Sequence, residues 1–294
     1  MLHWFGPTFP IDLIYGILNF LVAFIIISII GLRLNTDPKQ LLLILVTLLF
    51  PFLINGMLID WHFIPDQSKY LKDTIAFRSF DFGAIDHRPS IYIPSLILAL
   101  TPLPFLETFN DLGFANRLIM SLFIMFLINK QTPKLITYYL ILSPTILFYT
   151  STGLKETIVI ILTTISFYLI LKEKLLTALL PIILLILSKK QNGYLVLLVY
   201  LGYLYFFKIN FQGKKILSYF LFFNVFILLF IFNNFVIDNI NYFRFNFFVE
   251  NGGKDYYFNS VSSVIDLFLK TILGSVLFLL SPLPDVSSIF KISI

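Results

Sequence analysis

The sequence of 294 residues has no cysteine and few charges, and each shortage excludes a class of protein or of chemistry. Without cysteine the chain forms no disulfide, no thiolate metal site and no cysteine nucleophile. Charged residues make up 13% of it, against roughly 25% in a soluble domain whose surface must be solvated. A chain that is 58% hydrophobic cannot cover itself against water. We therefore expect lipid to be the solvent for much of its surface.

Signals for nucleic-acid and cofactor binding are also missing. The net charge is +5, but no basic helix or tail is present, and the Lys and Arg residues stand singly or in pairs between apolar runs. Such spacing is typical of residues that orient a chain in a membrane. No metal-ligand spacing, glycine-rich nucleotide loop or serine–histidine–acid arrangement is evident. The sequence predicts no nucleic-acid partner and no cofactor, and it leaves open whether a divalent metal is needed.

Apolar runs long enough to cross a bilayer follow one another along the chain. A spanning helix needs about 20 mostly apolar residues. The first run, Leu13–Leu32, follows a segment without Lys or Arg, so we interpret it as a retained helix rather than a cleaved signal peptide. The other runs are Leu41–Ile59, Arg117–Asn129, Leu135–Thr150, Thr157–Leu171, Leu175–Leu187, Tyr194–Phe207, Ile216–Ile237 and Ser263–Leu280. These runs predict an all-α, polytopic transmembrane helix bundle of about nine to ten spans, in one integral membrane domain over residues 1–294.

The loops divide into two sets by charge. Lys and Arg dominate the first set, which comprises Arg33–Gln40, Lys130–Lys134, Lys172–Lys174 and Lys208–Lys215. Acids and bases nearly balance in the second set, which comprises Asp60–Tyr92, Glu107–Arg117, Thr150–Glu156, Lys189–Gly193 and Asp238–Ser262. Because basic short loops stay cytoplasmic, we expect the second set outside, with 60–92 and 238–262 as the long outward loops.

One segment conflicts with a simple count of crossings. Ile93–Leu106 would have to cross if the loops on its two sides lay on opposite faces, but it is short and holds Pro94, Pro102 and Pro104. Proline interrupts helical hydrogen bonding. We interpret the segment as re-entrant or interfacial, which keeps the basic loops on one side. If it crosses fully, the later assignments reverse.

The first outward loop carries the densest polar cluster. Asp60 and Asp66 follow a predicted span, where a carboxylate can reach a lipid-bound headgroup, and Tyr70 begins the mixed apolar face of a predicted surface helix. Any one of these residues is explained as part of a solvated face, whereas polar residues gathered at the membrane rim favour function. Asp73, on the same helix, is expected to tolerate substitution.

Two further outward features carry lysines. In the segment from Ser143 to Thr157, Pro144 ends a helix, Gly153 permits a sharp turn, and Lys155 and Glu156 begin the next helix. Glu156 suits the positive end of the helix dipole but Lys155 does not, which suggests an anionic partner for the lysine. Paired Lys189 and Lys190 could bind a diphosphate, or simply snorkel from a short helix.

The last long loop interleaves aromatics with charges. Arg244, Glu250, Lys254 and Asp255 stand among Tyr and Phe residues between 238 and 262. Such a pattern suits a platform for sugar rings, and it equally suits an interfacial aromatic belt, which we favour.

The outward segments together resemble known membrane enzymes. An acidic first loop followed by the Arg-Pro-x-x-Tyr segment at Arg88–Tyr92 is similar to the polytopic type C glycosyltransferases. The segment Ser143-Pro144 … Tyr149 … Ser151 … Lys155-Glu156 resembles bacterial glycan polymerases of the O-antigen type. The resemblance covers 60–194, and the paired acids and large C-terminal soluble domain of some members are absent.

The resemblance implies an activity and a set of roles. It implies transfer of sugar from a polyprenyl-phosphate or polyprenyl-diphosphate donor to a glycan acceptor at the outer face of a bacterial cytoplasmic membrane. Asp60 or Asp66 would be the general base and Glu156 a second carboxylate. The lipid-linked substrate would contact Arg88, Lys155, Lys189, Lys190, Tyr70 and Tyr149. The alternative is a transporter or flippase for a related lipid, which would place ionisable residues and broken helices at mid-membrane.

Overall fold

The computed structural model describes residues 11–54, 66–208, 220, 223–224, 227, 231, 233–250, 260–263 and 265–272. Throughout this part the chain is helical and forms no strand, which confirms the predicted all-α class. The chain divides into two compact units, residues 1–203 and 204–294, and each is described by itself. That both units belong to one membrane domain stays a prediction.

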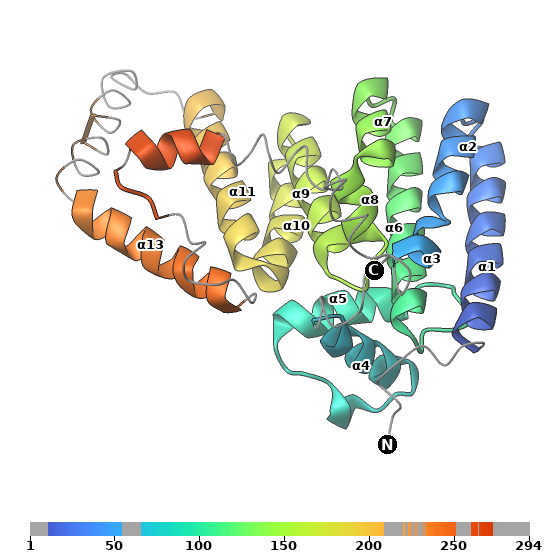
Figure 1. The fold of residues 1–294 in the computed structure, drawn as a ribbon. Coiled ribbons are helices and arrows are strands. Elements are labelled where there is room, and N and C mark those ends of the chain that lie inside the picture. The colour runs from blue at the N-terminus through green and yellow to red at the C-terminus, as the bar shows by residue number, and fades with distance from the viewer. Residues whose placement is uncertain are drawn as a thin grey trace, which may run out of the picture. The chain divides into compact units, whose positions relative to one another are not determined.

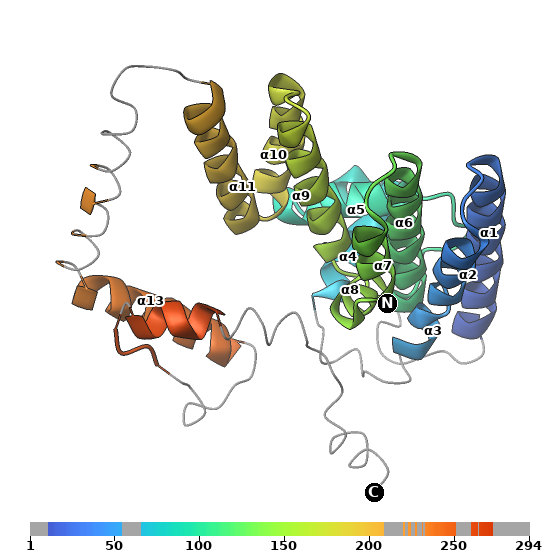
Figure 2. The same cartoon turned by 90° about the horizontal axis from the view of Figure 1, so that it is seen from above.

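The first unit is a row of helices with α6 near its middle. Figures 1 and 2 show α1 and α2 on one side of α6, and α9, α10 and α11 on the other. The helices are α1 Ile11–Arg33, α2 Pro38–Thr47, α3 Phe50–Ile54, α4 Gln67–Arg78, the 3-10 turn η2 Phe82–Ala84, α5 Pro89–Ala99, α6 Phe109–Asn129, α7 Lys134–Leu142, α8 Pro144–Thr150, α9 Glu156–Leu171, α10 Leu175–Ser188 and α11 Lys190–Tyr203.

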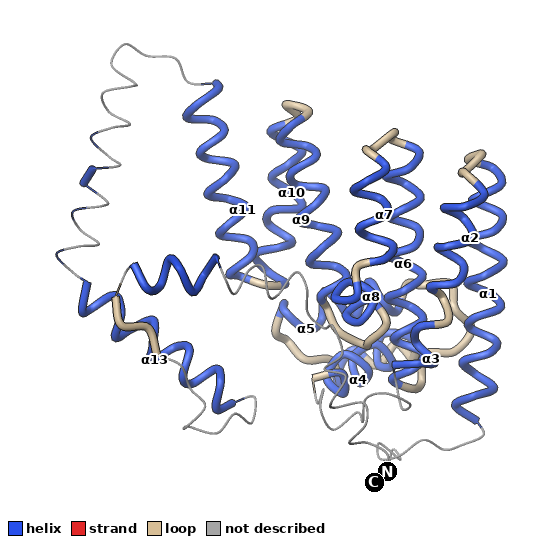
Figure 3. Tube along the Cα trace, turned by 45° about the horizontal axis from the view of Figure 1, so that its top comes forward, coloured by secondary structure: helices blue, strands red, loops and turns tan. Residues whose placement is uncertain are grey.

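Within this unit the turns α1–α2, α6–α7 and α9–α10 lie at the same end (Figure 3). Each holds one residue with positive φ: Asn35 at 49°, Gln131 at 54° and Glu173 at 60°. The amide that follows donates five residues back, from Thr36 to Gly31 O, from Thr132 to Leu127 O and from Lys174 to Leu169 O. These bonds define the Schellman motif, which satisfies carbonyls at a helix end. The basic loops 33–40, 130–134 and 172–174 share this end, and their cytoplasmic location stays a prediction.

The segment after α4 stays at the opposite end of the unit. Helix α5 packs on α4 there, away from the three basic turns (Figure 3). Arg78 fixes the chain beyond α5, because its Nη2 donates to Thr101 O at 2.7 Å and its Nε to Ala99 O at 3.2 Å. Pro102 and Pro104 follow before α6 begins. Residues 89–108 thus do not run the length of α6.

Among the described residues, two helices are long and apolar enough to cross a membrane, Leu13–Arg33 and Phe109–Asn129. That is fewer than the nine to ten predicted. Shorter apolar helices occupy Pro38–Ile54, Pro89–Ala99, Glu156–Leu171 and Leu175–Ser188. The predicted span Leu135–Thr150 is divided into α7 and α8, because Pro144 has no amide hydrogen to continue the helix. Much of Ile216–Ile237 and Ser263–Leu280 lies outside the described residues.

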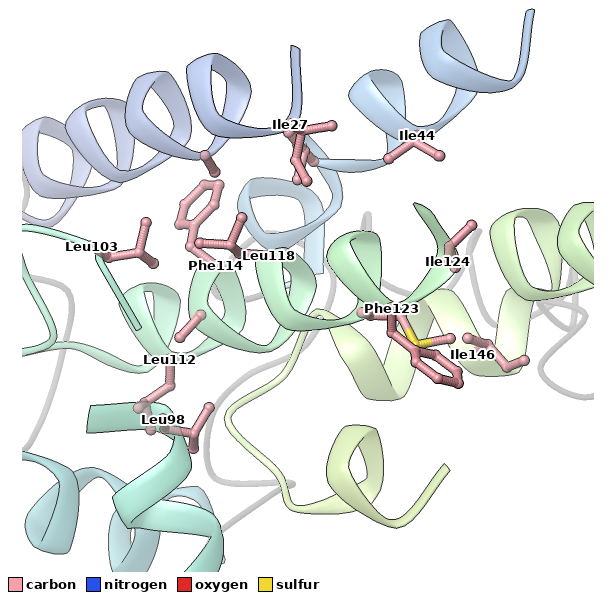
Figure 4. Packing of buried hydrophobic residues seen from close by; sticks show 14 of the residues in the cluster. Ile27, Ile44, Leu98, Leu103, Leu112, Phe114, Leu118, Phe123, Ile124 and Ile146 are labelled. Atoms are coloured by element: carbon pink, nitrogen blue, oxygen red, sulfur yellow. The ribbon is translucent and has the colours of Figure 1, made fainter. Parts of the chain in front are cut away.

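The core gathers around α6 (Figure 4). Leu112, Phe114 and Leu118 are fully buried there, and Phe114 meets the ring of Phe52 edge-on with centroids 4.7 Å apart. α6 begins where it does because Thr108 and Asp111 form a capping box: Asp111 N donates to Thr108 Oγ1, and Thr108 N donates to Asp111 Oδ2. The helix therefore starts eight residues before Arg117, where the sequence interpretation had placed its beginning.

The second unit contains a π-helical turn, Leu204–Lys208, and the helix α13, Asn233–Glu250. Residues 238–250 of the predicted outward loop 238–262 are therefore helical, and the outward location of this segment stays a prediction. Asn241 binds the backbone of Val261 both ways, donating to its carbonyl and accepting from its amide at 2.8 Å each. Lys254 and Asp255 lie outside the described residues, as do the side chains of Arg244 and Glu250.

Candidate functional site

The turn between α8 and α9 is held by side chains from two distant helices. Asn116 of α6 donates from Nδ2 to Thr152 O at 2.6 Å and to Leu154 O at 2.7 Å. Gln67 of α4 accepts from the amide of Gly153 at 2.7 Å. Asn116 and Gln67 are both buried. Because they bind backbone, they fix the path of the chain immediately before Lys155 and Glu156.

Gly153 is required by the closeness of its neighbours. A Cβ at this position would lie 2.9 Å from Leu112 Cδ1 and 3.1 Å from Gln67 Oε1. Contacts this short force Leu112 to shift and Gln67 to give way by a few tenths of an ångström, which strains its bond to the Gly153 amide. The sequence predicted a turn at Gly153 and the structure confirms it, but the reason is packing against α4 and α6.

Two lysines and one carboxylate meet beyond this turn. Glu156 is the first residue of α9, and Lys189 joins α10 to α11. Lys189 Nζ lies 3.3 Å from Glu156 Oε1, and both side chains are partly buried. Lys155 precedes Glu156; its burial lowers the pKa of its ammonium, the Glu156 charge opposes this shift, and the Lys189 charge adds to it. Glu156 and Lys189, 33 positions apart in the sequence, thus form an ion pair next to Lys155, and phosphate binding there stays a prediction.

Helix α4 adds a tyrosine and a carboxylate to the same group. Tyr70 is buried, which raises the pKa of its phenol, and the charges of Glu156 and Asp66 raise it further while that of Arg88 lowers it. Asp66 is 62% exposed and pairs with Lys69, whose Nζ lies 2.6 Å from Asp66 Oδ1. The charge of Asp66 also acts on Lys155. The predicted residues Asp66, Tyr70, Lys155, Glu156 and Lys189 therefore share one electrostatic neighbourhood, which we call the α4–α9 cluster.

The remaining predicted residues are placed differently. Arg88 is exposed and ion-paired with Asp86. Tyr149 packs the edge of its ring on Phe148, with centroids 5.2 Å apart, and lies within reach of the Glu156 charge. Lys190 is exposed, and its side chain makes no hydrogen bond or ion pair to any residue that the structure describes. Asp60 lies outside the described residues.

Asp73 is a residue that sequence reasoning undervalued. It is 1% exposed, and its two carboxylate oxygens accept from the amide of Asp86 at 3.2 and 3.1 Å. Burial raises the pKa of this carboxyl, while the Asp86 amide lowers it. Asp86 in turn binds Arg88, so Asp73 positions that arginine through the loop. The expectation that Asp73 tolerates substitution does not fit this burial; the polar spacing of α4 gave no signal of which face would be covered.

The chemistry open to the α4–α9 cluster follows from its groups. Clustered ammonium groups bind phosphate oxygens, and a carboxylate beside them can accept a proton. In the described part of the chain, no group of three or more His, Asp and Glu side chains converges as metal ligands. Glu156 with Asp66 supplies carboxylates, yet each already faces a lysine.

Comparisons with known proteins assign neither a family nor a fold to the chain. No family model, no curated protein and no solved structure matches it.

Proposed function

We propose that the first unit is embedded in a membrane as a bundle of more spans than its two long helices. α1 supports this, since large apolar side chains stand exposed along it, among them Ile14, Ile25 and Leu32. Exposed apolar surface of this extent is stable in lipid. α7 and α8 together cover Lys134–Thr150. Their combined length is about 25 Å at 1.5 Å per residue, which is close to the thickness of the hydrocarbon core of a bilayer. Helices α4 and α5 would lie at the outer interface.

Within that membrane, we propose transfer of sugar from a polyprenyl-phosphate or polyprenyl-diphosphate donor to a glycan acceptor. The carrying observation is the α4–α9 cluster, in which Lys155, Glu156 and Lys189 converge at the end of the bundle opposite the basic turns. A departing lipid phosphate needs fixed positive charge as the bond to the sugar breaks. Membrane lipids and the lipid-linked donor are then the partners, at the outer face of a bacterial cytoplasmic membrane.

The two carboxylates of the cluster have different roles in this proposal. Asp66 is open to water at the start of α4, where an acceptor hydroxyl can approach, so it takes the proton. Glu156 is more buried and holds Lys189 in place. Lys155, with a lowered ammonium pKa but no ion pair among the described residues, binds a phosphate oxygen of the donor. Tyr70 lines the same group from α4.

Substitution in proteoliposomes tests these roles, with a panel of polyprenyl-diphosphate-linked monosaccharides as donors. Asp66→Asn keeps the shape and removes proton acceptance, so turnover should fall by about 10²–10⁴. Lys155→Met and Lys189→Met should weaken donor binding by about tenfold to a hundredfold, the worth of a hydrogen bond to a charged group. Asp81→Asn and Lys72→Met are the matched controls, because both are exposed at the same end of the unit and should change neither value.

The competing base is Asp60, which must be tested beside Asp66. Near-normal product from both Asp60→Asn and Asp66→Asn would defeat the catalytic assignment. Unchanged donor binding in both lysine variants would return Lys155 and Lys189 to a snorkelling role.

One observation favours transport of a lipid-linked glycan as the second candidate. Arg117 lies inside α6, fully buried, and its hydroxyl partners are at the ends of two interrupted helices, α2 and α8. Transporters place ionisable residues and discontinuous helices together in this way. Movement of a fluorescent lipid-linked sugar between leaflets without any new glycosidic bond would favour this candidate over transfer.

A further inference from the structure

Gln67 begins α4 directly after Asp66, the base in the proposed transfer, yet the two side chains lie in different surroundings. The side chain of Asp66 is 62% exposed, whereas Gln67 is 1% exposed. Gln67 Oε1 accepts the amide hydrogen of Gly153 at 2.7 Å, across 86 positions of sequence. Lys155 follows two residues after Gly153. One hydrogen bond therefore connects the segment that carries the base to the turn that leads to the phosphate-binding lysine.

Three other side chains of α4 bind segments in and around α5. Thr74 Oγ1 donates to Ser95 O at 3.4 Å, and Asp73 accepts from the amide of Asp86. Arg78 donates to carbonyls at the end of α5 and beyond it. These bonds tie α4 to α5 and its flanking loops, not to the turn before α9. Apolar packing is non-directional, whereas a hydrogen bond needs one geometry, so the bond of Gln67 sets where α4 starts relative to that turn.

The turn 151–154 is also held from the other side, by α6. Asn116 donates to the carbonyls on both sides of Gly153, those of Thr152 and Leu154. These two bonds do not involve α4. Without the Gln67 bond, the turn would therefore keep its place on α6, while the start of α4 would be free to move away from it.

Sugar transfer by direct displacement needs the base and the phosphate site in one fixed arrangement. As the acceptor oxygen bonds to the anomeric carbon, Asp66 takes the proton of the acceptor hydroxyl. The bond from that carbon to the phosphate oxygen breaks, and its electron pair leaves on the phosphate that Lys155 holds. The two groups act on opposite sides of one carbon, and a misplacement of about 1 Å can cost about 100-fold in rate.

We propose that Gln67 is a positioning residue, which keeps Asp66 at the separation from Lys155 that sugar transfer requires. It acts through the Gly153 amide and touches neither donor nor acceptor. A purely structural role would be to satisfy that amide, since a buried N–H needs an acceptor. The two roles differ in what they change: stability alone, or stability together with turnover. This inference rests on the proposed function for the identity of the reaction.

Kinetics in proteoliposomes test the proposal, with polyprenyl-diphosphate-linked monosaccharides as donors and farnesyl diphosphate as the probe of donor binding. Gln67→Met keeps the length of the side chain and removes the acceptor, so kcat should fall about 100-fold. The Kd for farnesyl diphosphate should stay the same, because Asn116 still holds the turn before Lys155. Gln67→Glu keeps an acceptor oxygen of the same reach and should retain most of the turnover.

Gln40→Met is the matched control, because it is the same substitution at a buried glutamine of the opposite end. Gln40 Nε2 donates to Thr137 Oγ1 at 3.2 Å, between α2 and α7. The control should lower the melting temperature as Gln67→Met does, and leave kcat unchanged. Unchanged kcat in Gln67→Met, an equal fall in Gln40→Met, or an equal fall in Gln67→Glu would overturn the proposal. If Gln67→Met does not fold, Gln67→Asn decides, because its shorter side chain cannot reach the Gly153 amide from the same backbone position; unchanged kcat there has the same meaning.

The charge of Asp66 at Lys155 gives a second readout, which needs no sugar transfer. Burial lowers the pKa of the Lys155 ammonium, and the charges of Lys189 and Lys69 lower it further. The charges of Glu156 and Asp66 oppose this shift. Asp66→Asn should therefore lower the pKa of Lys155, by an amount that depends on how close Asp66 is held.

NMR of isotope-labelled, methylated lysines measures that pKa with and without the Gln67 acceptor. Asp66→Asn should lower the pKa of Lys155 less in the Gln67→Met background than in the otherwise unsubstituted chain. An equal decrease in both backgrounds would overturn the positioning of Asp66 by Gln67. A decrease that depends on Gln67, in a protein that transfers sugar from none of the donors, would defeat the transferase proposal and leave Gln67 as the residue that holds Asp66 near Lys155.

Discussion

The two ends of the first unit are closed by different kinds of bond. At the basic end, the turns at Asn35, Gln131 and Glu173 close through hydrogen bonds within about five residues of sequence. At the opposite end, the bonds join residues far apart in the sequence, such as Gln67 with Gly153 and Asn116 with Thr152. The residues of the α4–α9 cluster lie at the second end. Long-range bonds can hold a site in one geometry, whereas the local turns only reverse the chain.

Cysteine labelling gives the largest expected effect, because it is all or none. The chain has no cysteine, so each single cysteine substitution introduces the only thiol that can be labelled. In sealed vesicles, Asp81→Cys and Lys190→Cys should react with an impermeant maleimide from one side, and Lys130→Cys from the other, because basic turns stay cytoplasmic. All three positions are exposed. Labelling of Asp81→Cys and Lys130→Cys from the same side would show that the two ends of the unit do not face opposite sides of the membrane.

Loss of the Asn116 side chain is expected to give the next largest effect. Asn116→Leu removes both hydrogen bonds from Nδ2 to the turn 151–154 and leaves the carbonyls of Thr152 and Leu154 without this donor. The free energy of unfolding should fall by about 1–3 kcal/mol. Donor binding should weaken too, because Lys155 follows that turn. Asn129→Leu, exposed at the basic end of the same helix, is the control and should change neither quantity. Thermal unfolding measures the change in stability, and calorimetry measures the change in donor binding. Equal effects of both variants would show that the two ends do not differ in this way.

A glycine at a basic turn gives the smallest effect. Gln131 has a φ of 54°, a conformation that costs a side chain about 1–2 kcal/mol and glycine almost nothing. Gln131→Gly should therefore stabilise the protein by up to about 1 kcal/mol. This net value allows for the greater conformational entropy that glycine gives the unfolded chain, which opposes folding. Lys130→Gly, one residue earlier at a φ of −81°, should destabilise it instead. Thermal unfolding checks the sign; a loss of stability in Gln131→Gly would show that the turn is not strained.

Local signals in the sequence predicted the helices and several of their ends. Pro144 interrupts the helix and Gly153 lies in the turn before α9, as expected, whereas the second helix that begins at Pro144 was not expected. The start of α6 was also readable, since Thr108 and Asp111 are three residues apart in a capping-box pattern. That pattern sets the start of the helix at Phe109, so Arg117 lies inside it. The number of spans was less predictable, because apolar runs do not reveal where a proline divides one helix into two.

By itself the sequence determined that the chain is helical and apolar, with basic turns in alternate loops, because these properties depend on residue type and near neighbours. Tertiary structure alone decided which polar residues meet. It paired Glu156 with Lys189 rather than Lys190, buried Asp73 while leaving Asp66 exposed, and enclosed Arg117 between two helix ends. Those outcomes depend on how α4, α6, α9 and α10 pack, and residues brought together across dozens of positions leave no pattern in a single sequence.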